Sequence, residues 1–133
     1  MSESFSIKSN HSERELAFLS REGDDFWVEL KGTVSVKLNV YGYCPHSNDL
    51  ADWFEKLGSY NVPWPDELSW ESLEGEFKIS VECSSLGHVN FIISLKELPG
   101  THEESRIHVG IQTELGQIKR ISNGARKFFE REL

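Results

Sequence analysis

Apolar and polar residues alternate along two stretches of the chain, which is the pattern of β-strands with one buried and one solvated face. Residues 13–43 form the first stretch, and residues 76–112 form the second. Turn residues divide each stretch, so we predict two groups of antiparallel strands joined by hairpins. The predicted strands cover residues 16–19, 26–31, 33–40, 77–83, 89–95 and 107–111.

Two other segments follow the helical period, with apolar residues three or four positions apart. The first helix is predicted over residues 50–57, with Asn48 or Asp49 as its N-cap and Gly58 at its end. The second is predicted over residues 115–129, with basic residues on its polar side. Prolines between the first helix and the second group of strands predict an irregular loop there.

The predicted elements follow the order βββ-α-βββ-α. This order predicts an α+β fold, a mainly antiparallel sheet of about six strands with the two amphipathic helices on one face. We expect residues 1–133 to form a single domain, in which residues 1–13 are a flexible arm or an edge strand. The repeated order is compatible with an internal duplication, although no residue-level repeat supports one.

The charge of the chain is concentrated in one segment. The formal net charge is −8, which opposes binding to nucleic acid through general phosphate neutralisation. Residues 49–82 hold nine acids and two bases and therefore carry −7 of this charge. The predicted C-terminal helix is basic, so we expect an uneven distribution of charge over the molecule.

Cysteine content and the N-terminal sequence indicate a reducing compartment. Two cysteines among 133 residues are too few for a disulfide scaffold, and the polar N-terminus lacks the apolar core of a signal peptide. No apolar run approaches the roughly 20 residues that span a bilayer. We therefore expect a cytoplasmic protein that does not associate with a membrane.

The sequence contains no strong signature of catalysis or of a metal. The motifs GxxxxGK[ST], GxGxxG, GxSxG and HExxH are absent. Cys44, His46, Cys83 and His88 are soft ligands near predicted strand ends, but their spacing lacks a CxxC knuckle. Cys83 also continues an apolar strand face, and a disulfide with Cys44 is disfavoured in a reducing compartment. We therefore expect no catalytic residues, no cofactor and no metal.

Aromatic residues accompany the acids of residues 49–82, and such a combination suits an interface for a basic protein. Rings supply anchors, and carboxylates steer the partner. Under the alternative interpretation, Trp53 and Trp70 belong to the core and the acids are ordinary solvated surface. The candidate partner-binding residues are Tyr60, Trp64, Asp66, Glu67, Glu71 and Glu74.

Two functional hypotheses follow from these observations. The first is a non-enzymatic protein-binding module whose acidic aromatic surface meets a basic partner. The second is a small-ligand-binding or enzymatic domain with a pocket between sheet and helices, where His88 or His108 is the first residue to test. A homodimer through an edge strand or an exposed aromatic patch is compatible with either.

The sequence WESLEG at residues 70–75, followed by GHV at residues 87–89, carries a resemblance to a known group. With DLADWF at residues 49–54 and LGQIKRI at residues 115–121, it resembles a family of small bacterial proteins of unknown function. These proteins are similar in outline to WapI-type immunity proteins of polymorphic toxin systems. The resemblance implies an immunity-like α+β protein that neutralises a toxin domain, and it transfers no functional residue to this chain.

Overall fold

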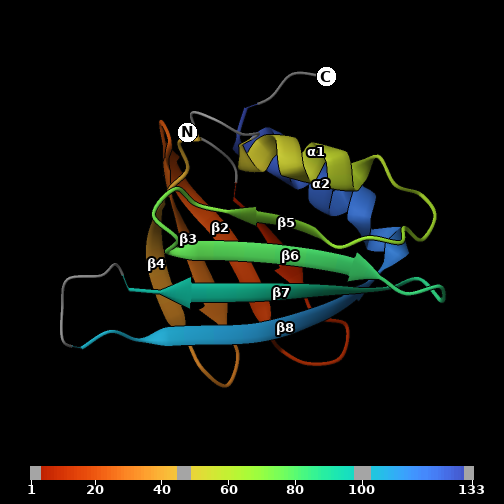
Figure 1. Ribbon diagram of the computed structural model, residues 1–133, viewed down its shortest axis with the longest axis horizontal. Helices are drawn as coiled ribbons and strands as arrows, with labels where there is room; N and C mark the ends of the chain where they lie inside the picture. Colours follow the sequence, from red (N-terminus) through yellow and green to blue (C-terminus); the bar gives the residue numbers. More distant parts are fainter. Residues whose placement is uncertain (1–3, 45–48, 98–102, 131–133) are drawn as a thin grey trace.

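The computed structural model describes residues 4–44, 49–97 and 103–130, and these contain eight strands and two α-helices in the order ββββ-α-ββββ-α (Figure 1). The predicted α+β class is confirmed. The predicted single sheet of about six strands is wrong, because the strands form two antiparallel sheets of four. The elements are β1 (Phe5–Lys8), β2 (Glu15–Glu22), β3 (Asp25–Lys31), β4 (Val36–Tyr41), α1 (Leu50–Gly58), β5 (Leu68–Glu71), β6 (Phe77–Cys83), β7 (His88–Lys96), β8 (Arg106–Glu114), a short 3-10 helix (Leu115–Gln117) and α2 (Ile118–Phe128).

Two short strands account for the wrong strand count. In β1, Phe5 pairs with Phe18 and Ile7 pairs with Leu16, so residues 5–8 are an edge strand. In β5, Trp70 pairs with Ile79. Each of these strands has four residues, which is too few for an alternating pattern to stand out in the sequence.

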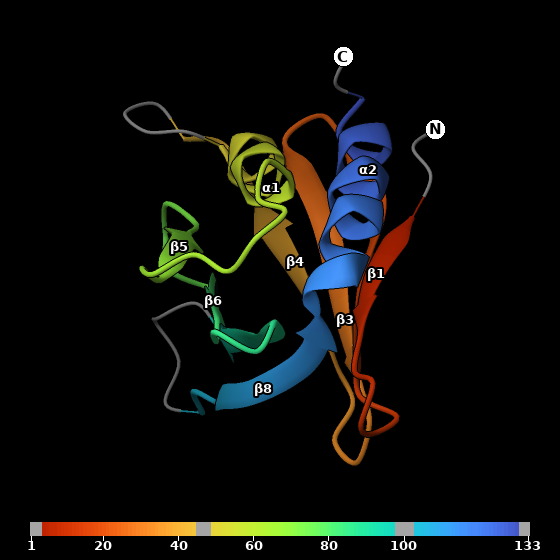
Figure 2. The same ribbon diagram turned by 90° about the vertical axis from the view of Figure 1, so that its right-hand side faces the viewer.

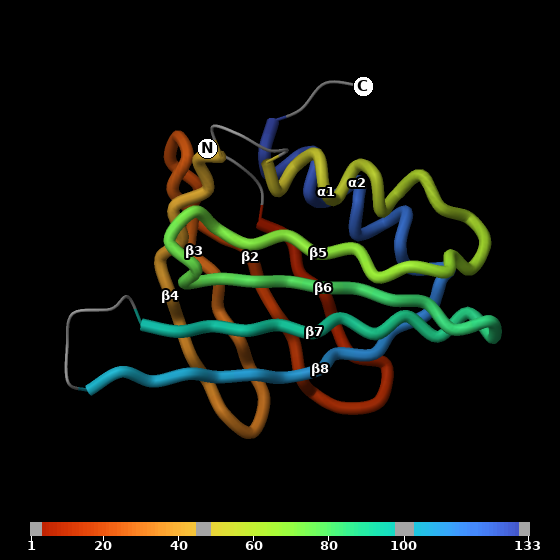
Figure 3. The backbone as a smooth tube through the Cα atoms, in the orientation of Figure 1, coloured from red at the N-terminus to blue at the C-terminus, as the bar shows by residue number. Residues whose placement is uncertain are grey.

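The N-terminal sheet (β1-β2-β3-β4) and the C-terminal sheet (β5-β6-β7-β8) face each other, and their strands cross steeply (Figures 1 and 3). The two helices lie side by side at one end of the sheets, α1 beside β5 and α2 beside β1 (Figure 2). The helices therefore close one end of the space between two sheets, rather than covering one face of a single sheet. Among the described residues, no helix is both long and apolar enough to cross a membrane.

Phe18 on β2 lies at the centre of the core between the sheets and is fully buried. Its ring stacks on Phe5 at an interplanar angle of 3°. Such aromatic pairs add stabilisation beyond the area that they bury. The centroid of the Phe18 ring lies 4.5 Å from Phe5, 6.1 Å from Phe26, 5.7 Å from Phe54, 6.0 Å from Phe77 and 6.3 Å from Phe128. These five partners come from β1, β3, α1, β6 and α2.

Strand β4 shows that a clean alternating pattern does not require a fully buried face. Val40 is buried, Val36 and Leu38 are half-buried, and Val34 lies before the strand with 54% of its surface exposed. The reason is that β4 is an edge strand, so only β3 packs beside it within the sheet.

Hydrogen bonds join the two sheets along both sides. On one side the buried Glu76 accepts hydrogen bonds from the backbone N–H of Tyr41, at 3.0 Å, and from the hydroxyl of Ser72. On the other side, Arg14 Nη1 donates to the carbonyl of Gly110 on β8 at 2.8 Å. Because a buried carboxylate must be compensated by hydrogen bonds, Glu76 fixes the edge of β4 against the loop before β6.

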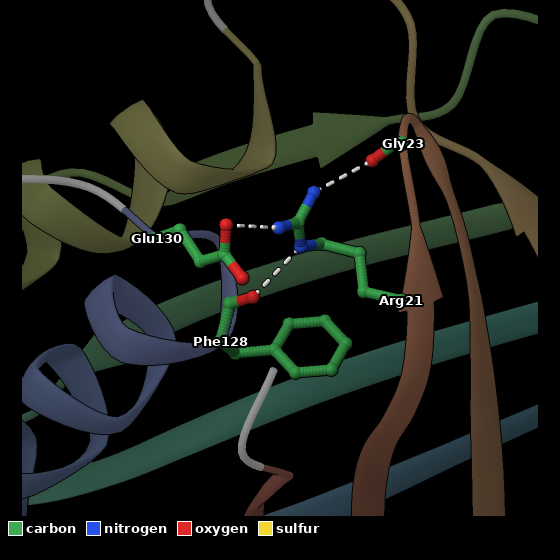
Figure 4. Close-up of polar contacts among 4 residues, drawn as sticks. All are labelled: Arg21, Gly23, Phe128 and Glu130. Atoms are coloured by element: carbon green, nitrogen blue, oxygen red, sulfur yellow. Dashed lines mark hydrogen bonds and ion pairs between the residues drawn. The ribbon is translucent and has the colours of Figure 1, made fainter. Parts of the chain in front are cut away.

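Arg21 ties the end of α2 to the β2–β3 hairpin (Figure 4). Its Nε donates to the carbonyl of Phe128 and its Nη1 to the carbonyl of Gly23, both at 2.8 Å, and its Nη2 lies 3.1 Å from Glu130 Oε2. A cation at the C-terminal end of a helix also complements the helix dipole. Arg21 lies within a register shift between Leu19 and Glu22, where the regular pairing of β2 with β3 is interrupted.

Helices α1 and α2 approach each other closely at Gly58. A Cβ atom added at this glycine would lie 2.1 Å from Ser122 Oγ and 2.4 Å from Ser122 Cβ. Glycine is therefore required at the end of α1 because the helices pack without space for a side chain, whereas the sequence indicated only a helix stop.

We expect Arg21→Ala to lower the free energy of unfolding by about 2 kcal/mol, because it removes charged hydrogen bonds from a largely buried site. Arg21→Lys should lose part of this stability, since an ammonium group cannot make three divergent contacts. Urea denaturation measures both effects. Lys119→Ala on the exposed side of α2 is the control, with an expected change within about 0.5 kcal/mol. Equal unfolding midpoints for Arg21→Ala and the wild type would contradict this role.

We expect Gly58→Ala to destabilise the protein by roughly 1–3 kcal/mol, because the new methyl group overlaps Ser122. Adding Ser122→Gly should recover much of this loss despite the lower helix propensity of glycine. Thermal unfolding of the two single variants and the double variant gives the coupling energy. Additive effects of the two substitutions would show that the helices adjust their separation instead.

Candidate functional site

A groove of about 290 Å³ lies between α1 and β5. Trp53 on α1 and Trp70 on β5 line it with aromatic rings, and both are mostly buried, as the core interpretation of these residues expects. The groove is present because α1 packs beside the edge strand β5. Its remaining lining is Asp52, Lys56, Leu68, Ser69 and Glu71.

Exposed carboxylates continue from this groove in both directions along the chain. Asp66 and Glu67 directly precede β5, and Glu74 lies in the turn that follows it. All three are exposed, as is Glu71. We use the name acidic groove for the groove between α1 and β5 together with Asp66, Glu67 and Glu74.

The aromatic candidates Tyr60 and Trp64 support the loop before β5. Their rings stack with centroids 4.8 Å apart and an interplanar angle of 24°. Tyr60 is half-buried, whereas Trp64 is only 4% exposed. The expectation that Trp64 presents its ring on the surface is therefore wrong, because the loop folds this ring into the core. The exposed part of the predicted surface consists of its carboxylates.

Three of the nine acids in residues 49–82 stabilise the fold. Asp49 Oδ1 accepts from the backbone N–H of Asp52 at 2.9 Å, and Asp52 Oδ2 accepts from the backbone N–H of Asp49 at 3.2 Å. This capping box fixes the start of α1 and confirms Asp49 as its N-cap. Together with the buried Glu76, these residues make the charge available on the surface smaller than the sequence suggests.

The structure also contains a pocket between the N-terminal sheet and the helices, as the second hypothesis requires. Its volume is about 170 Å³, and Arg21, Asp24 and Asp49 contribute its charged groups. Among the described residues, no histidine lines this pocket. Typical small-molecule sites are larger, at roughly 300–1,000 Å³.

The two histidines proposed for that hypothesis lie elsewhere. His88 begins β7, opposite Glu114, and is half-buried. His108 is exposed on β8, where its Nδ1 lies 2.9 Å from the hydroxyl oxygen of Ser94. Neither histidine lines the pocket between sheet and helices.

The candidate zinc ligands are only partly described. Cys44 and Cys83 are free thiols, and His46 lies outside the described residues. Within residues 4–44, 49–97 and 103–130, no group of three or more His, Cys, Asp or Glu residues is arranged to hold a metal ion.

Cys83 lies at the end of β6, beneath the loop that contains Trp64. Burial raises the pKa of the Cys83 thiol, and a backbone hydrogen bond from Trp64 offsets part of that increase. Because the thiolate is the reactive form, the folded chain should hold Cys83 in a less reactive state than an ordinary thiol.

We expect iodoacetamide to modify Cys83 more slowly in the folded protein than in urea at about pH 8, where thiolate begins to form. The pKa of the Cys83 thiol is higher in the folded protein than in the unfolded chain. The contribution of this thiol to the free energy of unfolding is therefore fully present below its unfolded-state pKa, and it is lost as pH rises through its folded-state pKa. The measurement uses Cys44→Ser, which leaves one thiol, and follows alkylation by mass spectrometry. Equal rates in folded and unfolded chains would contradict the shift.

Comparison with protein families gives one match, over residues 7–132. The comparison with curated proteins and the comparison with solved structures gave no match. The family match covers nearly the whole chain and gives no link to WapI-type immunity proteins. It includes both helices, the acidic groove and both sheets except the first two residues of β1. The chain therefore belongs to the family of unknown function DUF6228.

Proposed function

We propose that this protein is a non-enzymatic binding module that holds a basic protein partner in the acidic groove. The observation that carries the proposal is the groove of about 290 Å³ between α1 and β5, which exposed carboxylates border and the largely buried Trp53 and Trp70 line. The cations of a partner would meet the carboxylates, while an apolar side chain would cover the small exposed part of the two tryptophans. Such a division of roles is typical of protein interfaces.

Electrostatics support a basic partner. Within the described part of the chain, Lys56 is the one basic residue in the lining of the groove, where Asp52 and Glu71 supply carboxylates. Asp66, Glu67 and Glu74 add exposed negative charge next to β5 in the chain. Clustered charges of one sign increase the rate at which an oppositely charged partner associates.

The other pocket supports the second hypothesis less well. The space between the N-terminal sheet and the helices is about 170 Å³. Its basic residue Arg21 is already bound to Phe128, Gly23 and Glu130, so it stabilises the fold. The acidic groove therefore supports a binding module better than this pocket supports a small-ligand-binding or enzymatic domain.

We extend the proposal to the partner class that the sequence resemblance implies. A basic toxin domain would be steered to the acidic groove by the same carboxylates, and a stable complex could then block the toxin. In this role the module would act by occupying a surface of the toxin, without chemistry of its own.

We expect Asp66→Lys combined with Glu67→Lys to reduce capture of a basic partner from native lysate at least about ten-fold at low salt. Raising NaCl from about 0.05 M to about 0.5 M should weaken capture by the wild type in the same way, because salt screens exposed charges. Quantitative mass spectrometry of the captured proteins measures both effects.

The matched control is Glu13→Lys combined with Glu22→Lys, which changes the net charge equally but places the new lysines near β2. This control should retain the partner. Equal loss in both double variants would show that net charge alone governs capture, and the acidic groove would then have no specific role. Capture that is insensitive to salt would contradict electrostatic steering.

A further inference from the structure

Basic side chains surround a depression of about 250 Å³ on the outer face of the C-terminal sheet. Lys78, Lys96 and Arg106 contribute permanent positive charges to its lining, and Ser94 and His108 contribute hydrogen-bonding groups. In Figure 1 this face is turned toward the viewer, and the N-terminal sheet lies behind it. The formal net charge of the chain is −8, so these clustered basic residues are not explained by a need for charge to keep the protein soluble.

Strand register brings these residues together. Lys78 on β6 pairs with Ser94 on β7, and Ser94 pairs with His108 on β8. Lys96, the next residue of β7 on the same face as Ser94, pairs with Arg106 on β8. Because alternate residues of a strand share a face, these side chains all point away from the core, where Phe77 and Leu95 lie. The sheet itself therefore positions the site.

The polar groups of the site are available for an anion. The Nε of Arg106 lies 3.0 Å from Glu104 Oε1, and the Arg106 side chain is 73% exposed. Exposed ion pairs of this kind contribute little free energy, so an incoming anion can compete with Glu104. The pair of Ser94 and His108 adds a hydroxyl and an imidazole beside the cations.

One acid of the lining lies on the β5 side. Glu71 pairs with Lys78, and a Cβ added at Gly75 would lie 3.3 Å from Glu71 Oε2 and 3.6 Å from Lys96 Nζ. Glu71 therefore offsets part of the positive charge at that end of the depression. The β8 side, with Arg106 and His108, is the more favourable end for an anion.

We propose that this depression is a binding site for a phosphate group, either as free phosphate or as a phosphomonoester. Three cations match a dianion, and guanidinium and hydroxyl groups donate hydrogen bonds to its oxygens. A nucleic-acid polymer does not fit, since the overall charge of the chain repels an extended run of phosphates. This site shares Glu71 with the acidic groove, but its cations lie on β6, β7 and β8, outside that groove.

The test is a titration of the full-length 15N-labelled chain with inorganic phosphate, followed by two-dimensional NMR at constant ionic strength. We expect saturable shifts at residues 78, 94–96 and 106–110. Phenyl phosphate provides the phosphomonoester arm and acetate the carboxylate arm. Similar binding by both phosphates and weaker binding by acetate would support the proposal.

Lys78→Gln combined with Arg106→Gln should weaken phosphate binding at least about ten-fold, because two charge-assisted contacts are lost. Lys31→Gln combined with Lys37→Gln, at exposed positions of the N-terminal sheet, is the matched control and should change binding less than about two-fold. Both double variants replace exposed side chains, and their own spectra report whether they fold.

The proposal is overturned if the shifts do not saturate, if they spread equally over lysines elsewhere, or if both double variants bind alike. Failure here is distinguishable from failure of the binding-module proposal. Asp66→Lys combined with Glu67→Lys should leave the phosphate titration at residues 106–110 in place, whatever it does to capture of a protein partner.

Discussion

The structure depends on the aromatic contacts that surround Phe18. This ring is the point at which both sheets and both helices meet, because its partners include Phe77 from the C-terminal sheet, Phe54 from α1 and Phe128 from α2. Neither sheet can bury its inner face without the other, and neither helix covers the core alone. The packing of these rings thus fixes both sheets and both helices relative to one another.

Both candidate surfaces follow from this arrangement. Because α1 is fixed against the core by Leu50, Phe54 and Leu57, its side lies next to β5 and the two form a groove. Because the inner face of the C-terminal sheet packs into the core, its outer face presents polar residues in register across three strands. One face of this sheet serves stability, and the other is the face on which we propose the phosphate site.

Local patterns predict much of this fold. Alternation located most of the strands, helical spacing located both helices, and the capping signal at Asp49 was correct. The division into two sheets was missed, because it depends on contacts between distant segments and on the short strands β1 and β5. Periodicity reports which face of a strand is apolar, but it does not report which other element covers that face.

The candidate site was predictable only in part, because the burial of a side chain also depends on contacts between distant segments. In the sequence, Glu76 looks like its acidic neighbours, yet it is buried and binds the backbone of Tyr41. Trp64 looks like an exposed ring between prolines, yet it is buried. The row formed by Lys78, Ser94 and His108 depends on hairpin register, which the lengths of the intervening turns set.

Phe128 lies far along the chain from Phe18 and Phe26, and this separation has a consequence for synthesis on the ribosome. The four strands of the N-terminal sheet emerge first, but Phe18 and Phe26 receive this ring only when α2 has left the exit tunnel. Until then, the nascent chain keeps aromatic surface that its own α2 has not yet covered. A partner that shields this surface until α2 emerges would protect the chain from aggregation.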